Sequence, residues 1–292
     1  MNKYVNLVVF IDGTGNEISD TPRSQWTNIA RLYDACRECF GYGDVAEQRV
    51  FYRKGVGTRS GESFRGGLFG RYLQDRVKEA RTWLDLEIGL AADAGWTPRI
   101  YLFGFSRGAY AVRVLADQIN VRVELMGVWD TVKATITGPD VGKAGDNVKR
   151  ICHAMAIDEH RKLFDVVRFE DTPQATEVWF PGCHADVGGG YEEMDLALAS
   201  LNWVARIAED SGLIVDARRI PVERKFYHMP VMHDESRKFK WRMIGCLTGD
   251  ELITRTVKPG DLIYRTVREL ETTGEYDSGI GSGHEVIGRS GY

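Results

Sequence analysis

The sequence predicts an α/β fold built on a mostly parallel sheet that helices cover on both faces. Short apolar runs typical of buried strands alternate with stretches whose apolar residues recur at helical spacing. This alternation favours parallel strands joined by crossover helices. The 292-residue chain, 43% hydrophobic, is long enough to bury a sizeable core without metals or disulfides. We therefore expect a core domain over residues 1–220 and a C-terminal extension over residues 221–292 that completes or caps it.

Each expected element follows from its own pattern of apolar residues. Short apolar and aromatic runs predict strands at residues 4–11, 50–52, 99–103, 125–129 and 177–180. Helical spacing predicts helices at residues 29–40, 73–91, 109–119, 148–164 and 194–208, with Gly212 closing the last one. Beyond residue 220 the pattern weakens to charged turns and short strands, including a strand-like stretch at 226–232. The glycine- and serine-rich residues 279–292 predict a flexible tail.

The chain is organised around Ser106, which lies between an expected strand and an expected helix. Gly104, Ser106 and Gly108 form G-x-S-x-G, the pattern of a nucleophile elbow. A strand that turns sharply into a helix crowds its own backbone, and glycines relieve that crowding. The turn would hold the Ser106 hydroxyl at the carboxyl edge of the sheet, beside the positive end of the next helix. The sequence therefore predicts Ser106 as a catalytic nucleophile.

Further polar residues follow the other expected strands. Asp130 ends the strand after the elbow, and His184 and Asp186 follow the strand at 177–180. Ligands of open α/β sheets bind at the carboxyl ends of the strands, so we expect these side chains at one edge. A serine nucleophile needs an imidazole to take its proton and a carboxylate to fix that imidazole. The chain order Ser106, Asp130, His184 is that of α/β-hydrolases, and we predict these three as the catalytic residues.

A second assignment of the base and the acid stays open. His153 and His160 fall within a helical pattern, which favours structural roles for both. His233, beside the strand-like stretch at 226–232, is the main rival to His184. With His233 as the base, Asp186 would become the acid.

The oxyanion of an acyl-transfer intermediate needs backbone donors. The amide of Arg107, directly after the nucleophile, is one candidate donor. The loop after the first strand, near Gly13 and Thr14, is the other. A tight turn into a helix would also explain that loop.

The segment 53–71 is dense in glycine and arginine. A mobile solvated loop explains this composition. Alternatively, Arg53, Arg59 and Arg65 belong to a substrate-facing flap that binds an anionic headgroup or phosphate. Both interpretations stay open.

The overall composition limits the classes of partner and compartment. A formal net charge of −4 gives no general basis for nucleic-acid binding. No apolar run approaches the length of a membrane span and no signal-peptide pattern opens the chain, which leaves peripheral membrane contact open. Five scattered cysteines favour free thiols over zinc or disulfides. We therefore expect a cytoplasmic protein without a cofactor or metal, with export by a signal-independent route still open.

Six sequence blocks resemble, in this order, an uncharacterised α/β-hydrolase family that includes the type VI secretion phospholipase effectors. The blocks are FIDGTGN at 10–16, TNIARL at 27–32, GVGT at 55–58, LFGFSRGAY at 102–110, GVWDTV at 127–132 and WFPGCHADVGGGY at 179–191. The resemblance covers roughly the first two-thirds of the chain. It implies an α/β-hydrolase-like fold and a Ser-Asp-His hydrolase in which Ser106, Asp130 and His184 act on a small-molecule or lipid ester. Phospholipids are the substrates of some members.

Two other functions stay open at this stage. A metal-dependent phosphohydrolase would use Asp12, Asp130, His184 and Asp186, although the pattern His184-x-Asp186 is too short to specify a metal. The motif that begins at Asp12 is similar to that of haloacid-dehalogenase phosphatases, but those place the aspartate nucleophile two residues earlier, where this chain has Phe10. The third hypothesis is a non-catalytic binding module that keeps the fold.

Overall fold

The computed structural model describes residues 3–19, 21–37, 41–55, 66–133, 138–237 and 252–288. Within these ranges eight strands form one sheet in the order β2-β1-β3-β4-β5-β6-β7-β8, and every neighbouring pair is parallel. The strands are β1 (Tyr4–Ile11), β2 (Val45–Arg53), β3 (Thr97–Phe105), β4 (Val123–Trp129), β5 (Ile151–Ala156), β6 (Ala175–Phe180), β7 (Leu262–Tyr264) and β8 (Glu285–Ile287).

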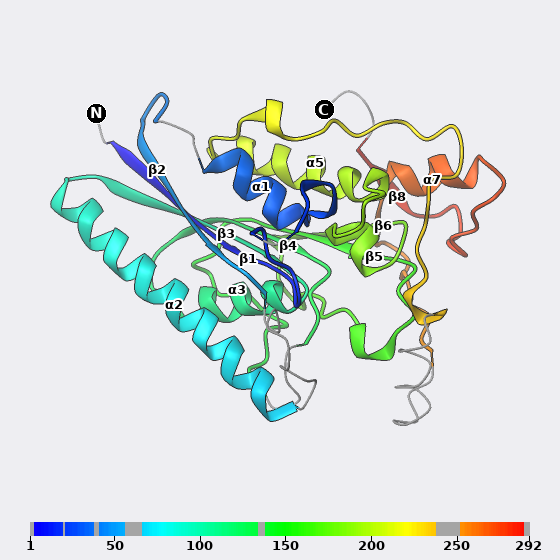
Figure 1. Ribbon diagram of the computed structural model, residues 1–292, viewed down its shortest axis with the longest axis horizontal. Helices are drawn as coiled ribbons and strands as arrows, with labels where there is room; N and C mark the ends of the chain where they lie inside the picture. The colour runs from blue at the N-terminus through cyan, green and yellow to red at the C-terminus, as the bar shows by residue number, and fades with distance from the viewer. Residues whose placement is uncertain are drawn as a thin grey trace.

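Helices cover both faces of this sheet. Those in the described ranges are α1 (Asn28–Cys36), α2 (Gly66–Asp93), α3 (Arg107–Gln118), α4 (His184–Gly188), α5 (Asp195–Asp210) and α7 (Arg265–Glu271). α1 and α5 lie on one face, and α2 and α3 lie on the other (Figure 1). The expected α/β-hydrolase-like class, a mostly parallel sheet between two helical layers, is confirmed.

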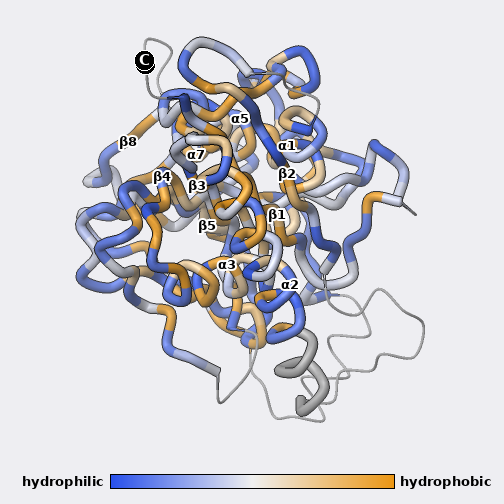
Figure 2. Tube along the Cα trace, turned by 90° about the vertical axis from the view of Figure 1, so that its left-hand side faces the viewer, coloured by the Kyte–Doolittle hydropathy of each residue, from blue (hydrophilic) through white to orange (hydrophobic). Residues whose placement is uncertain are grey.

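The alternating side chains of β1 explain how one strand serves both layers. Leu7 and Val9 pack in the apolar cluster that contains α2 and α3, while Val8 and Phe10 pack in the cluster that contains α1 and α5. All four are fully buried, as expected for a central parallel strand. The more hydrophobic stretches accordingly lie on the central strands and the helices packed on them (Figure 2). A third apolar cluster forms around β7 and α7.

The direction in which successive strands are added to the sheet reverses between β1 and β3. From β1 the chain moves to β2 on one side, and from β2 it crosses to β3 on the other side of β1. Ligand sites of open α/β sheets lie at such a reversal, outside the carboxyl ends of the strands. Asp12 follows β1 and Ser106 follows β3, so both lie at the reversal.

The prediction of a helix at residues 148–164 is wrong, because residues 151–156 form strand β5 in the middle of the sheet. Every residue of β5 is buried. Ala154, Met155 and Ala156 favour helices on their own, and packing between β4 and β6 overrides that preference. His153 is therefore a strand residue, whose Nε2 accepts from the Thr131 amide at 3.2 Å.

Three smaller expectations also differ from the structure. Residues 226–232 form no strand; Phe226, Met229 and Met232 instead pack against the cluster of β7 and α7. The expected tail includes β8, which pairs with β7. Residues 66–71, which the sequence analysis placed in a loop, are the first residues of α2. No helix in the described part of the chain is long and apolar enough to cross a bilayer.

Candidate active site

Ser106 lies between β3 and α3 in a backbone conformation that few non-glycine residues adopt, with φ 59° and ψ −123°. The flanking glycines make this turn possible. A β-carbon on Gly104 would lie 2.5 Å from the carbonyl oxygen of Gly108, and one on Gly108 would lie 2.2 Å from that of Ile11. The Ser106 amide donates to the Trp129 carbonyl oxygen at 2.9 Å, which ties the turn to the end of β4. This strained turn is the elbow that the sequence predicts.

His184 lies next to the elbow, at the first residue of α4. Its ring stacks on Phe105, the residue before Ser106, with centroids 4.6 Å apart. The Phe164 ring packs against the same imidazole in a T-shaped arrangement, with centroids 5.0 Å apart. Burial lowers the pKa of His184, which favours the neutral imidazole that a general base requires. Within the described residues the Ser106 hydroxyl makes no hydrogen bond, and such bonds in free enzymes often tighten only with substrate.

Asp130 follows β4 and binds the imidazole of His184. Its carboxylate oxygen Oδ2 lies 2.5 Å from His184 Nδ1. Because an ionised carboxylate only accepts, Nδ1 carries the proton and Nε2 is left as the basic nitrogen. The second oxygen, Oδ1, accepts from the Ala156 amide at 3.0 Å. Burial alone would raise the pKa of Asp130, but the charge of Arg255 and the contacts with His184 hold it well below its usual range.

Arg255 is the residue of this site that sequence reasoning missed. Its Nη1 donates to Asp130 Oδ1 at 2.6 Å, and its Nη2 donates to Asp130 Oδ2 at 3.0 Å. Nη1 also donates to the carbonyl oxygen of Ala156 at 2.7 Å, and Nη2 donates to that of Phe164. Arg255 lies in an irregular segment without motif or periodicity, so the sequence carries no signal for it.

A buried ion pair supports the start of α4. Glu159 Oε2 accepts from the backbone amide of His184 at 3.3 Å. Arg161 binds both oxygens of Glu159, at 2.8 and 2.6 Å, and its guanidinium lies 3.7 Å from the ring centroid of Phe164. The two charges offset one another beside the imidazole while they fix the backbone that carries it.

The rival histidine and acid also form a pair. His233 Nδ1 lies 2.8 Å from Asp186 Oδ1, and the His233 amide donates to Asp186 Oδ2 at 3.0 Å. The Cys183 amide donates to the same oxygen at 3.0 Å. The His233 ring stacks on Tyr191 at 3.7 Å, with Nε2 3.6 Å from Glu193 Oε2. Asp186 thus accepts two backbone amides and joins α4 to the C-terminal segment.

Asp12 is buried at the end of β1 and fixes the loop that follows it. Its carboxylate accepts from the Gly13 amide at 2.7 Å, from Thr27 Oγ1 at 2.9 Å and from the Tyr52 hydroxyl at 2.8 Å. Burial raises the pKa of Asp12 to about 6, and these three hydrogen bonds oppose the rise. Asp12 therefore joins β1, β2 and the start of α1.

The expected oxyanion donors lie in two neighbouring segments. The Gly13 amide is bound to Asp12, so it would have to leave that carboxylate to meet an oxyanion. Arg107 opens α3 directly after the nucleophile, and its Nη1 donates to Thr14 Oγ1 at 3.3 Å. Gly55 packs against the same loop, because a β-carbon there would lie 1.7 Å from the Gly13 carbonyl oxygen.

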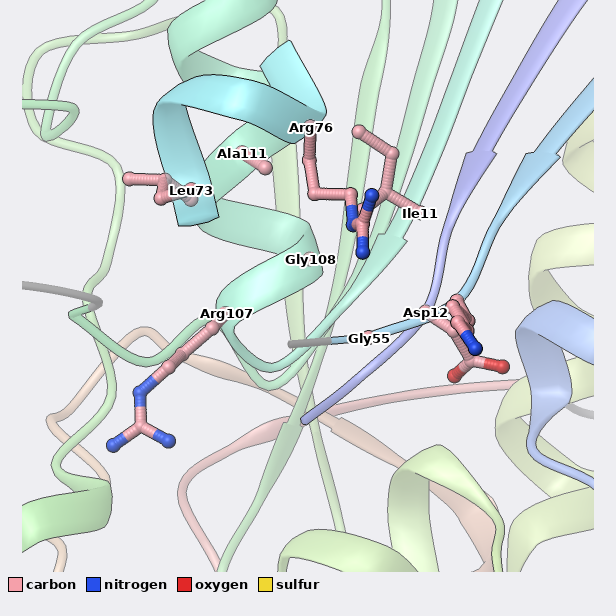
Figure 3. Close-up of a pocket in the computed structure, with 9 residues that line it drawn as sticks. Ile11, Asp12, Gly55, Leu73, Arg76, Arg107, Gly108 and Ala111 are labelled. Atoms are coloured by element: carbon pink, nitrogen blue, oxygen red, sulfur yellow. The ribbon is translucent and has the colours of Figure 1, made fainter. Parts of the chain in front are cut away.

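A small pocket lies beside this loop, between the end of β1, α2 and α3 (Figure 3). Its volume of about 10 Å³ suits a single water molecule rather than an ester substrate. Arg76 extends from α2 toward Gly108, while the guanidinium of Arg107 points away from it (Figure 3). The other lining residues are Ile11, Asp12, Lys54, Gly55, Leu73 and Ala111.

Of the three arginines expected in a substrate-facing flap, only Arg53 lies in the described residues. Its Nε lies 2.9 Å from Glu79 Oε2 of α2, and its guanidinium lies 5.4 Å from the ring centroid of Phe51. Arg59 and Arg65 lie outside the described residues.

The four residues of the metal-dependent alternative belong to three separate groups of contacts. Asp130 binds His184, Asp186 binds a different histidine, and Asp12 binds two hydroxyls and an amide. In the described ranges no group of three or more histidine, cysteine, aspartate or glutamate side chains is arranged to hold a metal ion. The geometry therefore gives this alternative no support.

Comparisons with known proteins bear on the family and the fold of the chain. The model of the T6SS phospholipase effector Tle1-like catalytic domain matches residues 5–121 and 116–207. The uncharacterized protein YEL023C of Saccharomyces cerevisiae is 33% identical over 141 residues, 44% of this chain and 19% of that protein.

Two solved structures are similar to parts of this chain. An uncharacterized protein from Pseudomonas aeruginosa has a TM-score of 0.52 at 18% identity, over 76% of this chain and 48% of that one. The Tle1 effector bound to the VgrG spike of the type 6 secretion system has a TM-score of 0.49 at 19% identity, over 65% of this chain and 52% of that one. The chain thus spans about half the length of these two proteins and about a fifth of the yeast relative. Because the family model spans well over half of its 292 residues, this chain belongs to the family of Tle1-like phospholipase effector catalytic domains.

Proposed function

We propose that this chain is a serine hydrolase that cleaves carboxylic esters, those of phospholipids included, through an acyl-enzyme on Ser106. The observation that carries the proposal is a strained serine elbow flanked by a buried His184–Asp130 pair. Membership of a phospholipase effector family supports the lipase or esterase class of the reaction.

Two features support His184 and Asp130 over His233 and Asp186 as base and acid. The first pair adjoins the nucleophile, because His184 stacks on the residue before Ser106 and Asp130 directly follows the strand paired with β3. In the second pair, Asp186 already accepts two backbone amides, which is typical of a structural anchor.

The reaction would proceed in two stages. As Ser106 Oγ attacks the ester carbonyl carbon, its proton moves to His184 Nε2, and Asp130 stabilises the resulting imidazolium. The carbonyl oxygen becomes an oxyanion, for which the backbone amides of Arg107 and Thr14, two residues whose side chains bond each other, are the candidate donors. His184 then protonates the leaving alcohol, and water repeats these steps on the acyl-enzyme to release the acid.

These contributions have expected sizes. Each oxyanion donor is worth about 3–4 kcal/mol in the transition state. General base catalysis by a positioned histidine contributes a factor of about 10² to 10⁴. The serine and the histidine act as one unit, so losing either one should remove nearly all turnover.

The test measures hydrolysis of p-nitrophenyl esters of graded chain length and of phospholipid vesicles. Wild type should turn over at least one ester class, and Ser106→Ala should lower kcat by a factor of about 10⁴ or more with an unchanged melting temperature. Ser19→Ala, at an exposed serine of a surface loop, is the matched control and should behave as wild type. A Ser106→Ala variant that keeps kcat within about tenfold of wild type would contradict the proposal.

A second measurement separates the competing functions. A fluorophosphonate probe should label wild type and spare Ser106→Ala, with or without a chelator. Chelator-sensitive phosphatase activity would favour the metal-dependent alternative, and inertness toward esters and probe alike would favour a binding module.

A further inference from the structure

The acid of the candidate triad is bound by an arginine from outside the region that the family model matches. Arg255 lies beyond residue 207, the last matched residue, yet its side chain is 1% exposed and contacts both oxygens of Asp130. The usual serine triad requires only a carboxylate that orients the imidazole. Arg255 places a full positive charge against that carboxylate.

The guanidinium binds both carboxylate oxygens of Asp130 and is itself held by two backbone carbonyl oxygens. Nη1 and Nη2 each donate to one oxygen of Asp130, and each also donates to a carbonyl oxygen, that of Ala156 or that of Phe164. The segment carrying Arg255 is fixed nearby, because the Ile253 amide donates to the His160 carbonyl oxygen at 2.9 Å. A planar fork with fixed partners imposes one orientation on the carboxylate.

We propose that Arg255 is a positioning residue that locks the Asp130 carboxylate toward His184 and offsets its charge, so that His184 stays an unprotonated base at lower pH. The proposal rests on the assignment of His184 as the base. An anion beside an imidazole favours the protonated ring, whereas an anion already paired with a guanidinium favours it less. The cost is a weaker base, and the gain is activity under more acidic conditions.

The other charges around this pair do not account for such an effect. Glu159 and Arg161 face His184 from the segment after β5, and they are paired with each other. Asp186 lies on the same helix as His184 and is paired with His233. His153 neighbours Asp130 from β5, but burial lowers its pKa and keeps it neutral. Within the described part of the chain, Arg255 is therefore the cationic side chain that contacts Asp130 and is paired with no other carboxylate.

The experiment compares wild type with Arg255→Gln and Arg255→Lys in the full chain. Two quantities are measured: the acid limb of kcat/KM against pH, and the pKa of His184 from NMR of labelled histidine. Arg255→Gln removes the positive charge that offsets Asp130. The midpoint of the acid limb and the pKa of His184 should therefore both rise by about one pH unit. The size follows because an opposite charge within about 4–6 Å shifts the pKa of a group by 1–3 units, and Arg255 acts on His184 only through Asp130. Arg255→Lys keeps the charge but lacks the fork, so it should lower kcat with a much smaller pH shift.

Arg113→Gln is the matched control. Arg113 is also buried and bonds backbone carbonyl oxygens, those of Val141 and Val167, but contacts neither Asp130 nor His184. Arg113→Gln should lower the melting temperature and leave the acid limb of kcat/KM unchanged. It therefore separates the effect of lost packing from the effect of the lost charge on Asp130. If Arg255→Gln does not fold, the comparison of Arg255→Lys with wild type still tests the requirement for the fork.

A folded Arg255→Gln with an unchanged or lowered His184 pKa would overturn the proposal, as would Arg255→Lys with wild-type kcat. The NMR titration does not depend on turnover. A raised His184 pKa in a chain that hydrolyses no ester would therefore uphold the effect of Arg255 and refute the proposed hydrolase.

Discussion

Asp130→Asn is the substitution whose consequence follows most directly from the contacts. Oδ1 accepts from Arg255 Nη1 and the Ala156 amide, whereas Oδ2 accepts from Arg255 Nη2 and His184 Nδ1. An amide group at the Oδ1 position would face two fixed donors. At the Oδ2 position it would face one fixed donor and an imidazole that can change tautomer. The asparagine should therefore donate to His184 Nδ1, which moves the ring proton to Nε2 and leaves Ser106 without a base.

The substitution should affect both turnover and stability. The wrong tautomer should lower kcat by a factor of about 10⁴, the size seen where the same exchange has been made in a serine triad. The loss of the carboxylate also leaves Arg255 buried without its counter-charge, which costs about 3–5 kcal/mol of folding stability. Activity and stability should fall together in this variant.

The double variant Asp130→Asn/Arg255→Gln separates the two effects. It removes the uncompensated charge, so its melting temperature should recover toward wild type while kcat stays low. Circular dichroism, thermal melts and p-nitrophenyl ester hydrolysis measure the three proteins side by side. A folded Asp130→Asn with kcat within about tenfold of wild type would refute the tautomer argument.

Three further predictions concern the elbow, the loop after β1 and the second His–Asp pair. Gly108→Ala should cost roughly 1–3 kcal/mol of stability and slow fluorophosphonate labelling, because the new methyl would lie 2.2 Å from a backbone oxygen; an unchanged melt would contradict this. Burial raises the pKa of Asp12 in the folded chain to about 6. Between about pH 4 and pH 6 the folded chain therefore keeps a proton that the unfolded chain has released. The free energy of unfolding should fall by roughly 3 kcal/mol as the pH rises through this range. Asp12→Asn should flatten this pH dependence of the unfolding free energy, which urea denaturation measures. An unaltered pH dependence would show that Asp12 is not the group responsible. His233→Gln should lower the melting temperature yet keep ester turnover within about tenfold of wild type, whereas a loss of more than about 100-fold would transfer the base role to His233.

The sequence predicts the fold well where local pattern and packing agree. The run at 4–11 and the helix after Ser106 appear with close to their expected bounds, because apolar periodicity and glycine chemistry act there without competition. Residues 148–164 fail because alanine and methionine favour helix locally, while the space between β4 and β6 requires a strand. Local preference is overridden by neighbours that are distant in sequence.

The candidate site shows the same division. Ser106, Asp130 and His184 each follow a strand expected from its apolar run, so topology alone brings them to one edge. The short α4 that carries His184 depends instead on Glu159 and on the Cys183–Asp186 contact, which no pattern announces. Long-range charge pairing of this kind leaves no periodic trace in a single sequence.

Both rival pairs exist in the folded chain, which the sequence had treated as alternatives. His233 and Asp186 do bind each other, and together they hold the C-terminal segment against α4. In each pair the histidine lies beside the aspartate that the sequence analysis assigned to it. Their placement relative to β3 helps to distinguish them, and that information comes from the fold.

Mass-spectrometric mapping of a fluorophosphonate adduct in wild type, His184→Ala and His233→Ala decides whether Ser106 is the nucleophile and His184 its base. We expect one adduct on the peptide that contains Ser106, its loss in His184→Ala and its retention in His233→Ala. An adduct on another residue, or labelling of Ser106 that survives in His184→Ala and disappears in His233→Ala, would contradict it.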